Sequence, residues 1–212
     1  VEHGQMDEFY RITKKAIDFV FVIATPMMLY FTLFAKEGVY FLSGSAYAGA
    51  IIPMQIIMPT LLFIGLTNIM GIQMLVPLGR EKIVLYSEIA GVIVDVVLNA
   101  LLIPRMASAG AAIGTLAAEA TVWMVQFIAL KNNVFESYKK IRYFSIIIAL
   151  LVATAVSHFA EFLSLGSFLT LCVSAILFFG TYGGVLTIAR EPLVIEIEQQ
   201  IFKKLKGRHH IR

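Results

Sequence analysis

Three carboxylates and one amide lie inside long apolar segments of the sequence. Glu88, Asp95 and Asn99 are spaced by seven and four residues, which places them on one face of a helix. Gly91 falls on the same face, and Glu119 is the acid of the next apolar segment. Ionisable groups in apolar surroundings are costly unless they point into a protein interior or a wet cavity. These groups could therefore hold a shared proton or a cation, or form hydrogen bonds that join helices.

The composition is that of a protein whose solvent is lipid. Of the 212 residues, 59% are hydrophobic and 15% are charged, whereas soluble domains average about 45–50% and about 25%. This excludes a water-soluble enzyme domain, a disordered chain and a nucleic-acid-binding protein. The one cysteine, Cys172, excludes an internal disulfide and a cysteine-based metal cage.

Six segments are long enough to cross a bilayer, which takes about 20 apolar residues of helix. They are residues 16–34, 50–76, 83–103, 109–130, 144–162 and 165–188. Backbone polar groups cannot stay unpaired in hydrocarbon, so each segment is expected to be an α-helix. The sequence thus predicts an all-α multi-pass membrane protein, with a cytoplasmic segment at 1–15, a six-helix lobe at 16–188 and a basic amphipathic tail at 189–212.

The basic residues predict the orientation of these spans. All but Lys36 and Arg105 of the 17 Lys and Arg residues fall on one side of the predicted spans. Cytoplasmic loops carry an excess of Lys and Arg, so both chain ends are expected in the cytoplasm. The net charge of +3 is then explained by topology and by contacts with anionic lipid, without a nucleic-acid partner.

The predicted helices place two carboxyl groups at similar depth. With a rise of 1.5 Å per residue, Asp95 lies about 18 Å from the inner boundary and Glu119 about 15 Å from the outer boundary. If they face each other, like-charge repulsion favours one shared proton, as in a proton- or cation-coupled carrier. If they do not, each joins helices by hydrogen bonds, the interpretation we favour for Glu119. Glu88, about 8 Å from the inner boundary, is within reach of interfacial water.

Prolines mark a second candidate region. Pro26 in the first span, and Pro53 and Pro59 in the second, are expected to interrupt and bend their helices. Transporters use such broken helices near cavities and gates. Asn68 is one of several polar residues in the second span, which indicates that one side of this span is wet or packed against another helix.

Small residues predict close contacts between helices. Gly110 and Gly114 open the fourth span in a small-xxx-small pattern, which lets two helices approach closely. Gly180 and Gly184 repeat this spacing in the last span. Both pairs are interpreted as packing sites.

The sequence contains no motif that indicates an enzyme. It lacks a Walker loop, a dinucleotide fingerprint, a His-Glu-x-x-His pattern and a nucleophile beside a plausible histidine base. No segment outside the spans is long enough to fold as a catalytic domain. A channel or carrier is expected, with no cofactor other than a coupling ion, H⁺ or Na⁺, and with no bound metal.

Residues 95–104 read Asp-Val-Val-Leu-Asn-Ala-Leu-Leu-Ile-Pro, and residues 109–115 read Ala-Gly-Ala-Ala-Ile-Gly-Thr. An Asn-bearing helix that ends in Leu-Ile-Pro, followed by a Gly-Ala-Ala helix start, resembles a hallmark of polysaccharide flippases. These belong to the multidrug/oligosaccharidyl-lipid/polysaccharide (MOP) exporter superfamily. Residues 42–50 and 79–82 are similar to a loop and a basic turn of that family. The resemblance covers about residues 9–129 and departs at 106–108, where members often have a basic residue and a glycine.

The resemblance implies a fold and a function. Members have two six-helix lobes related by pseudo-symmetry around a central cavity, so this chain would be the C-terminal lobe, and the missing N-terminal lobe would be its partner. The implied function is to move an undecaprenyl-pyrophosphate-linked oligosaccharide across the bacterial cytoplasmic membrane by alternating access, for surface polysaccharide biosynthesis. The pyrophosphate would need cationic partners, which we expect in the missing lobe.

Three other functions stay open. A cation-coupled multidrug exporter of the same superfamily would use Asp95 and Glu119 to bind the coupling ion. A membrane-embedded glycan polymerase or ligase usually needs a sizeable outer loop, and the longest outer connection predicted here is residues 35–49. A structural scaffold would have no use for an acid at the middle of the membrane.

The expectation of a missing lobe is tested by the DNA upstream of the Val1 codon. We expect six further spans in frame, beside genes for glycosyltransferases. A stop codon just upstream, with a usable start at Val1 or Met6, would contradict this and leave a self-associating six-helix carrier.

Overall fold

A computed structural model describes residues 2–163 and 166–196, and within these residues the chain is helical and holds no strand. The elements are α1 (Glu2–Leu33), α2 (Ala35–Ser43), η1 (Ser45–Ala50), α3 (Ile51–Ile57), α4 (Thr60–Thr67), η2 (Asn68–Leu75), α5 (Glu81–Met106), α6 (Ser108–Lys139), α7 (Tyr143–Ser157), η3 (His158–Leu163) and α8 (Ser167–Ile188). The all-helical expectation is confirmed. Most of the predicted tail, residues 197–212, lies outside the described residues.

Five helices are long and apolar enough to cross a membrane. They are Glu8–Leu33, Glu81–Met106, Ser108–Lys139, Tyr143–Ala160 and Ser167–Ile188. A sixth crossing is formed if Ser45–Ile57 and Thr60–Leu75, which meet at a bend of 42°, act as one span. The second predicted span, residues 50–76, is therefore not one continuous helix but a series of short helical segments. Its polar residues and prolines favour breaks that the five longer helices avoid.

The prolines act differently from one another. Pro59 lies between α3 and α4, where the bend occurs. Pro53 is in the first turn of α3, where a missing backbone N–H costs nothing. The helix α1 continues through Pro26, so the interruption predicted there is absent. A second irregularity, which the sequence analysis did not anticipate, is the π-helical stretch η2 that follows α4.

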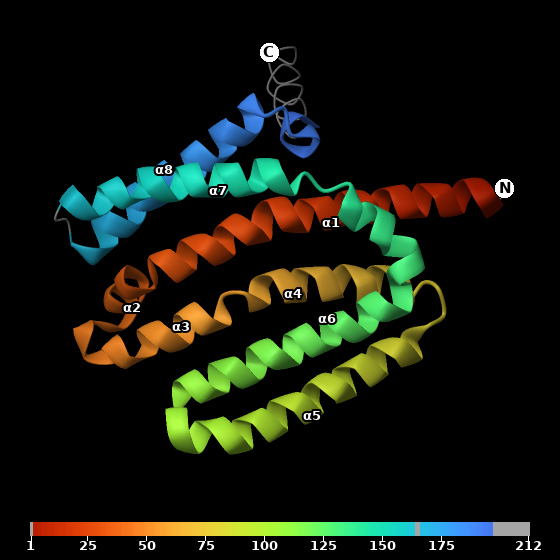
Figure 1. Cartoon of the computed structure of the whole chain (residues 1–212), viewed down its shortest axis with the longest axis horizontal. Helices are drawn as coiled ribbons and strands as arrows, with labels where there is room; N and C mark the ends of the chain where they lie inside the picture. Colours follow the sequence, from red (N-terminus) through yellow and green to blue (C-terminus); the bar gives the residue numbers. More distant parts are fainter. Residues whose placement is uncertain (1, 164–165, 197–212) are drawn as a thin grey trace, which may run out of the picture.

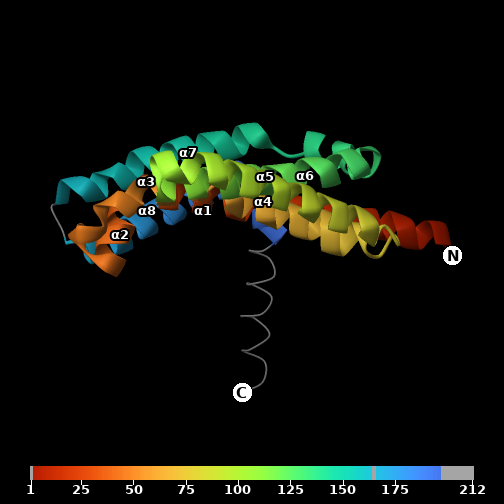
Figure 2. The ribbon, with the colours of Figure 1, turned by 90° about the horizontal axis from the view of Figure 1, so that it is seen from below.

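The helices lie side by side in one curved layer (Figures 1 and 2). At one edge α5 packs on α6, and α6 in turn packs on α3 and α4. The long helix α1 runs alongside α4, and α7 and α8 pack on each other at the opposite edge of the layer. The buried apolar core runs along α1 and is filled by side chains such as Ile17, Phe34, Met70, Met74 and Phe178. Among the described elements, α5 packs mainly on α6 and touches η2 over a smaller area.

The outer face of α5 is apolar and is not covered by any described residue. Leu85, Tyr86, Val92 and Val96 are among its large exposed side chains, and only 6% of its most apolar stretch is buried. Large exposed apolar surfaces indicate contact with lipid or with another protein body. Within the described residues, the packed face of α5 is therefore the one that points to α6.

The turn between α5 and α6 holds these two helices close together. Ala107 alone separates them and has a φ of 48°, a backbone conformation that glycine adopts at little cost. Just beyond it, a Cβ on Gly110 would lie 2.6 Å from the carbonyl of Leu102. Because that neighbour is backbone, only glycine allows the two helices to approach so closely at this point.

We expect Ala107→Gly to stabilise the protein by about 1 kcal/mol, because glycine removes the strain of a positive φ. The measurement is thermal unfolding of the purified protein in detergent. As a control, Ala100→Gly in the regular part of α5 should lower stability by about 1 kcal/mol. Equal losses in both variants would show that the turn stores no strain.

Candidate functional site

The predicted carboxylates meet in a groove between α5 and α6. A cavity of about 170 Å³ is lined by Glu88 and Asp95 of α5 and by Thr115 and Glu119 of α6. The floor between the helices is narrow, since a Cβ on Gly91 would lie 2.6 Å from a methyl group of Val122. The structure thus brings three of the acids predicted from the sequence to one site.

A second cavity continues this groove toward α4 and η2. It has a volume of about 310 Å³ and shares Glu88 and Glu119 with the first cavity. Thr67, Asn68 and Gln126 add their polar side chains to it. The predicted residue Asn68 therefore belongs to the same groove, which is lined by four elements: α4, η2, α5 and α6. We call the two cavities together the polar groove.

At the other end of the groove, Asp95 and Asn99 pack against Gly114. A Cβ on Gly114 would overlap the amide oxygen of Asn99 and lie 3.2 Å from the Asp95 carboxylate. The atoms Asp95 Oδ1 and Asn99 Oδ1 are both buried, and no described residue donates a hydrogen bond to either. Two unsatisfied acceptors thus lie side by side in the contact between the helices, where they cost free energy.

Glu119 lines both cavities of the groove, with Glu88 in each of them and with Asp95 in the smaller one. Asp95 and Glu119 were predicted to lie at similar depth, with their facing left open. Depth alone does not decide which side chains interact, since the helix face must agree as well. Asp95 shares the smaller cavity with Glu119 but packs with Asn99 against Gly114.

The sequence analysis missed Gln126 and Ser87. Both are fully buried, and the Gln126 amide donates a hydrogen bond of 3.0 Å to Ser87 Oγ. A signal was present, because Gln126 follows Glu119 by seven residues and therefore lies on the same face of α6. This bond ties α5 to α6 beside the acidic pair, and Gln126 Oε1 has no partner among the described residues.

The predicted kink residues lie away from the polar groove. Neither Pro53 nor Pro59 lines its two cavities, and Pro26 lines a separate apolar cavity of about 500 Å³. Gly110 contacts the end of α5 rather than the groove. Among the described residues, no three His, Cys, Asp or Glu side chains are grouped closely enough to hold a metal ion. The groove offers carboxylate, amide and hydroxyl groups, which can bind sugar hydroxyls, a proton or a small cation.

The chain matches no protein-family model, and no curated protein or solved structure is significantly similar to it. The resemblance to polysaccharide flippases therefore rests on the residues quoted above, two of which, Asp95 and Asn99, line the contact at Gly114.

Replacing Asp95 by asparagine should raise the stability of the protein. The amide supplies N–H donors where two buried acceptors now lie together, and it removes a charge from the helix contact, a gain of about 1 kcal/mol. The reverse change, Asn99→Asp, places a second carboxylate in the same contact and should lower stability by about 1–3 kcal/mol. Thermal unfolding in detergent measures both, and a loss of stability in Asp95→Asn would contradict this account.

Proposed function

We propose that this chain is one lobe of a membrane transporter that moves an undecaprenyl-pyrophosphate-linked oligosaccharide across the bacterial cytoplasmic membrane by alternating access. The observation that supports the proposal is the polar groove, built from four elements among membrane-spanning helices. Buried polar groups within a membrane mark substrate or ion pathways. The resemblance to polysaccharide flippases supplies the class of substrate.

The chemistry of the groove fits an oligosaccharide. Sugar hydroxyls both donate and accept hydrogen bonds, so they can use the oxygens of Glu88, Asp95 and Glu119 and the amide of Asn68. Asp95 Oδ1 in particular lacks a donor among the described residues.

The lipid pyrophosphate needs positive charge, which the polar groove does not supply. No Lys or Arg side chain lines either of its two cavities. In the proposed transporter, a second lobe would supply the cationic partners of the pyrophosphate. The uncovered outer face of α5 is a surface on which such a lobe could pack.

One observation favours a second candidate, a cation-coupled multidrug exporter. Glu88 of α5 and Glu119 of α6 line the same two cavities of the groove. Two close carboxylates favour binding of a shared proton or a cation. In this alternative the ionised groups carry the function, whereas in the flippase the hydrogen-bonding groups carry it.

Amide and apolar substitutions separate these two functions. The intact protein is reconstituted in vesicles with a lipid-linked oligosaccharide, and translocation is measured by access of a glycosidase to the sugar. For a flippase, Asp95→Asn and Glu119→Gln keep their hydrogen bonds and should change the rate less than about threefold. Asp95→Leu removes these bonds and should slow translocation about tenfold or more.

Glu136→Gln provides the matched control, because Glu136 is an exposed carboxylate near the end of α6 and outside the polar groove. All variants are compared at equal amounts of folded protein. If the amide variants abolish ion-dependent drug export, while the oligosaccharide is not moved by the unmodified protein, the flippase proposal is wrong and the exporter is supported.

A further inference from the structure

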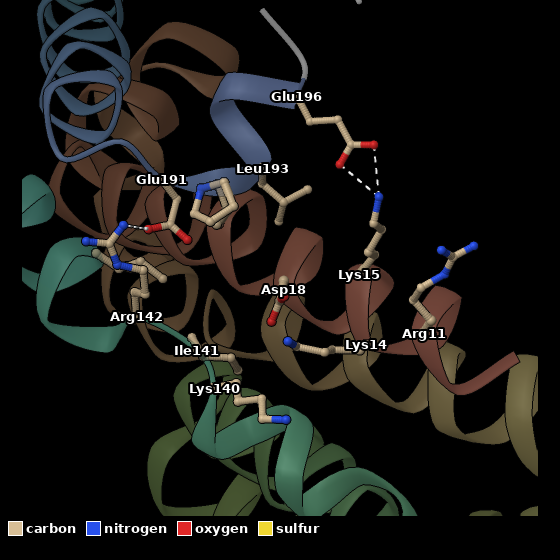
Figure 3. A pocket seen from close by; sticks show the side chains of 13 residues that line it. Arg11, Lys14, Lys15, Asp18, Lys140, Ile141, Arg142, Glu191, Leu193 and Glu196 are labelled. Atoms are coloured by element: carbon tan, nitrogen blue, oxygen red, sulfur yellow. Dashed lines mark hydrogen bonds and ion pairs between the residues drawn. The ribbon is translucent and has the colours of Figure 1, made fainter. Parts of the chain in front are cut away.

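A charged pocket lies where the basic residues of α1 meet those of the connection between α6 and α7 (Figure 3). It has a volume of about 240 Å³ and is lined by α1, by the connection from α6 to α7, and by the segment after α8. Its five cationic side chains are Arg11, Lys14, Lys15, Lys140 and Arg142, and its three acidic ones are Asp18, Glu191 and Glu196. We call it the basic pocket, since its lining carries an excess of positive charge.

Three of these cations already have partners. Arg11 pairs with Glu8 at 2.9 Å, and Lys15 pairs with Glu196 at 2.9 Å. The Arg142 guanidinium donates to the carbonyl oxygens of Ala189 and Arg190, at 3.1 and 3.0 Å, and lies 3.7 Å from Glu191. The contacts of Arg142 join the end of α8 to the start of α7. Together with the other two ion pairs, they leave the remaining two cations as the groups that could bind a ligand.

Lys14 and Lys140 are these two cations, and they reach the pocket from different elements (Figure 3). Lys14 attracts the charge of Asp18, but no ion pair or hydrogen bond links either ammonium to a described residue. Two ammonium groups without a fixed partner in a concave site favour an anion, and each ammonium offers three donors.

Two acceptors in the same pocket lack donors. Asp18 Oδ1 and Glu191 Oε2 are buried and accept no hydrogen bond from a described residue. Among the described residues, the Glu191 oxygen forms an ion pair only with Arg142 Nη1, at 3.7 Å. Burial raises the pKa of the Glu191 carboxyl, and the Arg142 guanidinium opposes that rise. The pocket therefore needs both an anion for its two ammonium groups and hydroxyl donors for its carboxylates.

An apolar cavity adjoins the basic pocket. It has a volume of about 500 Å³, and its lining comes from α1, α8 and the segment after α8. Val22 of α1 lines both cavities, and beyond α8 the neighbours Leu193 and Val194 line one each. A charged site and an apolar groove that share a wall have the shape of an amphiphile.

We propose that the basic pocket and the apolar cavity together bind one phospholipid with a hydroxyl-bearing anionic headgroup, of the phosphatidylglycerol type. The phosphodiester lies between Lys14 and Lys140, and the glycerol hydroxyls donate to the two carboxylates. One acyl chain fills the apolar cavity along α1 and α8. The basic residues predict that this end of the layer faces the cytoplasm, so the lipid belongs to the inner leaflet. This proposal does not depend on the transport function.

The test measures binding of phosphatidylglycerol and phosphatidylcholine with identical acyl chains to the intact protein in detergent, by native mass spectrometry. We expect phosphatidylglycerol to bind about tenfold more tightly. Removing both free cations in Lys14→Gln/Lys140→Gln should weaken its binding about 30-fold. The matched control is Arg80→Gln/Lys82→Gln, which removes two charges from the same predicted side but outside the pocket, and which should leave binding unchanged.

A second pair of variants tests the acyl-chain groove. Gly183 lines the apolar cavity and Gly180 does not, and a Cβ at either position meets no atom within 4 Å. Gly183→Leu should fill the apolar cavity and weaken the binding of phosphatidylglycerol about tenfold. Gly180→Leu should leave this binding unchanged.

Three results would overturn the proposal. Equal losses in the two charge variants would mean that only general surface charge attracts the lipid. Wild-type binding by Gly183→Leu would show that no acyl chain occupies the groove. If inorganic phosphate displaced bound phosphatidylglycerol as effectively as added phosphatidylglycerol does, the pocket would be a site for free phosphate instead.

Discussion

A carboxylate inside a membrane must turn away from hydrocarbon, and this constraint governs how α5 meets α6. The helix α5 carries its acids on one face and large apolar side chains on the other. Only the acidic face can be covered by the chain itself, so α6 must come close to it. Gly91, Gly110 and Gly114 make this approach possible, because a Cβ at any of them would collide with the facing helix. The polar groove therefore forms because the acids of α5 must point away from lipid, and because the glycines let α5 and α6 approach closely.

The same constraint explains why the molecule is a layer instead of a bundle. A helix with a polar face and an apolar outer face needs only one neighbour, so α5 forms an edge. At the other edge, α7 and α8 hold few polar groups and pack mainly on each other. The helix α1 carries the buried apolar core between these edges. A layer of this kind exposes broad apolar surfaces, which a bilayer or another lobe would cover.

The helical class and the long spans could be predicted because apolar length is a local property. The shared face of Glu88 and Asp95 followed from helix periodicity, whereas the place of Glu119 beside them depends on how α6 packs on α5. Other features depended on information that spacing does not hold. Similar depth alone left open whether Asp95 faces Glu119, and the packing of α5 on α6 brings both of them, with Glu88, to one cavity. The broken second span depends on where each proline falls within a turn: Pro26 leaves α1 continuous, whereas a bend lies at Pro59.

The polar groove and the basic pocket lie at different places on the same long helix. Glu119 lies near the middle of α6, and Lys140 follows its last residue. Twenty residues of helix separate Glu119 from that end, which corresponds to about 30 Å. Two unit charges about 30 Å apart interact by less than about 1 kcal/mol even at an effective dielectric constant of about 20, so the cations of the pocket do not compensate the acids of the groove. Each region must therefore satisfy its charges locally. In the groove, Asp95 Oδ1 and Gln126 Oε1 accept no hydrogen bond from a described residue. In the pocket, the ammonium groups of Lys14 and Lys140 form no ion pair with a described residue. Each region thus offers polar groups to a ligand, the groove to a hydrogen-bond donor and the pocket to an anion.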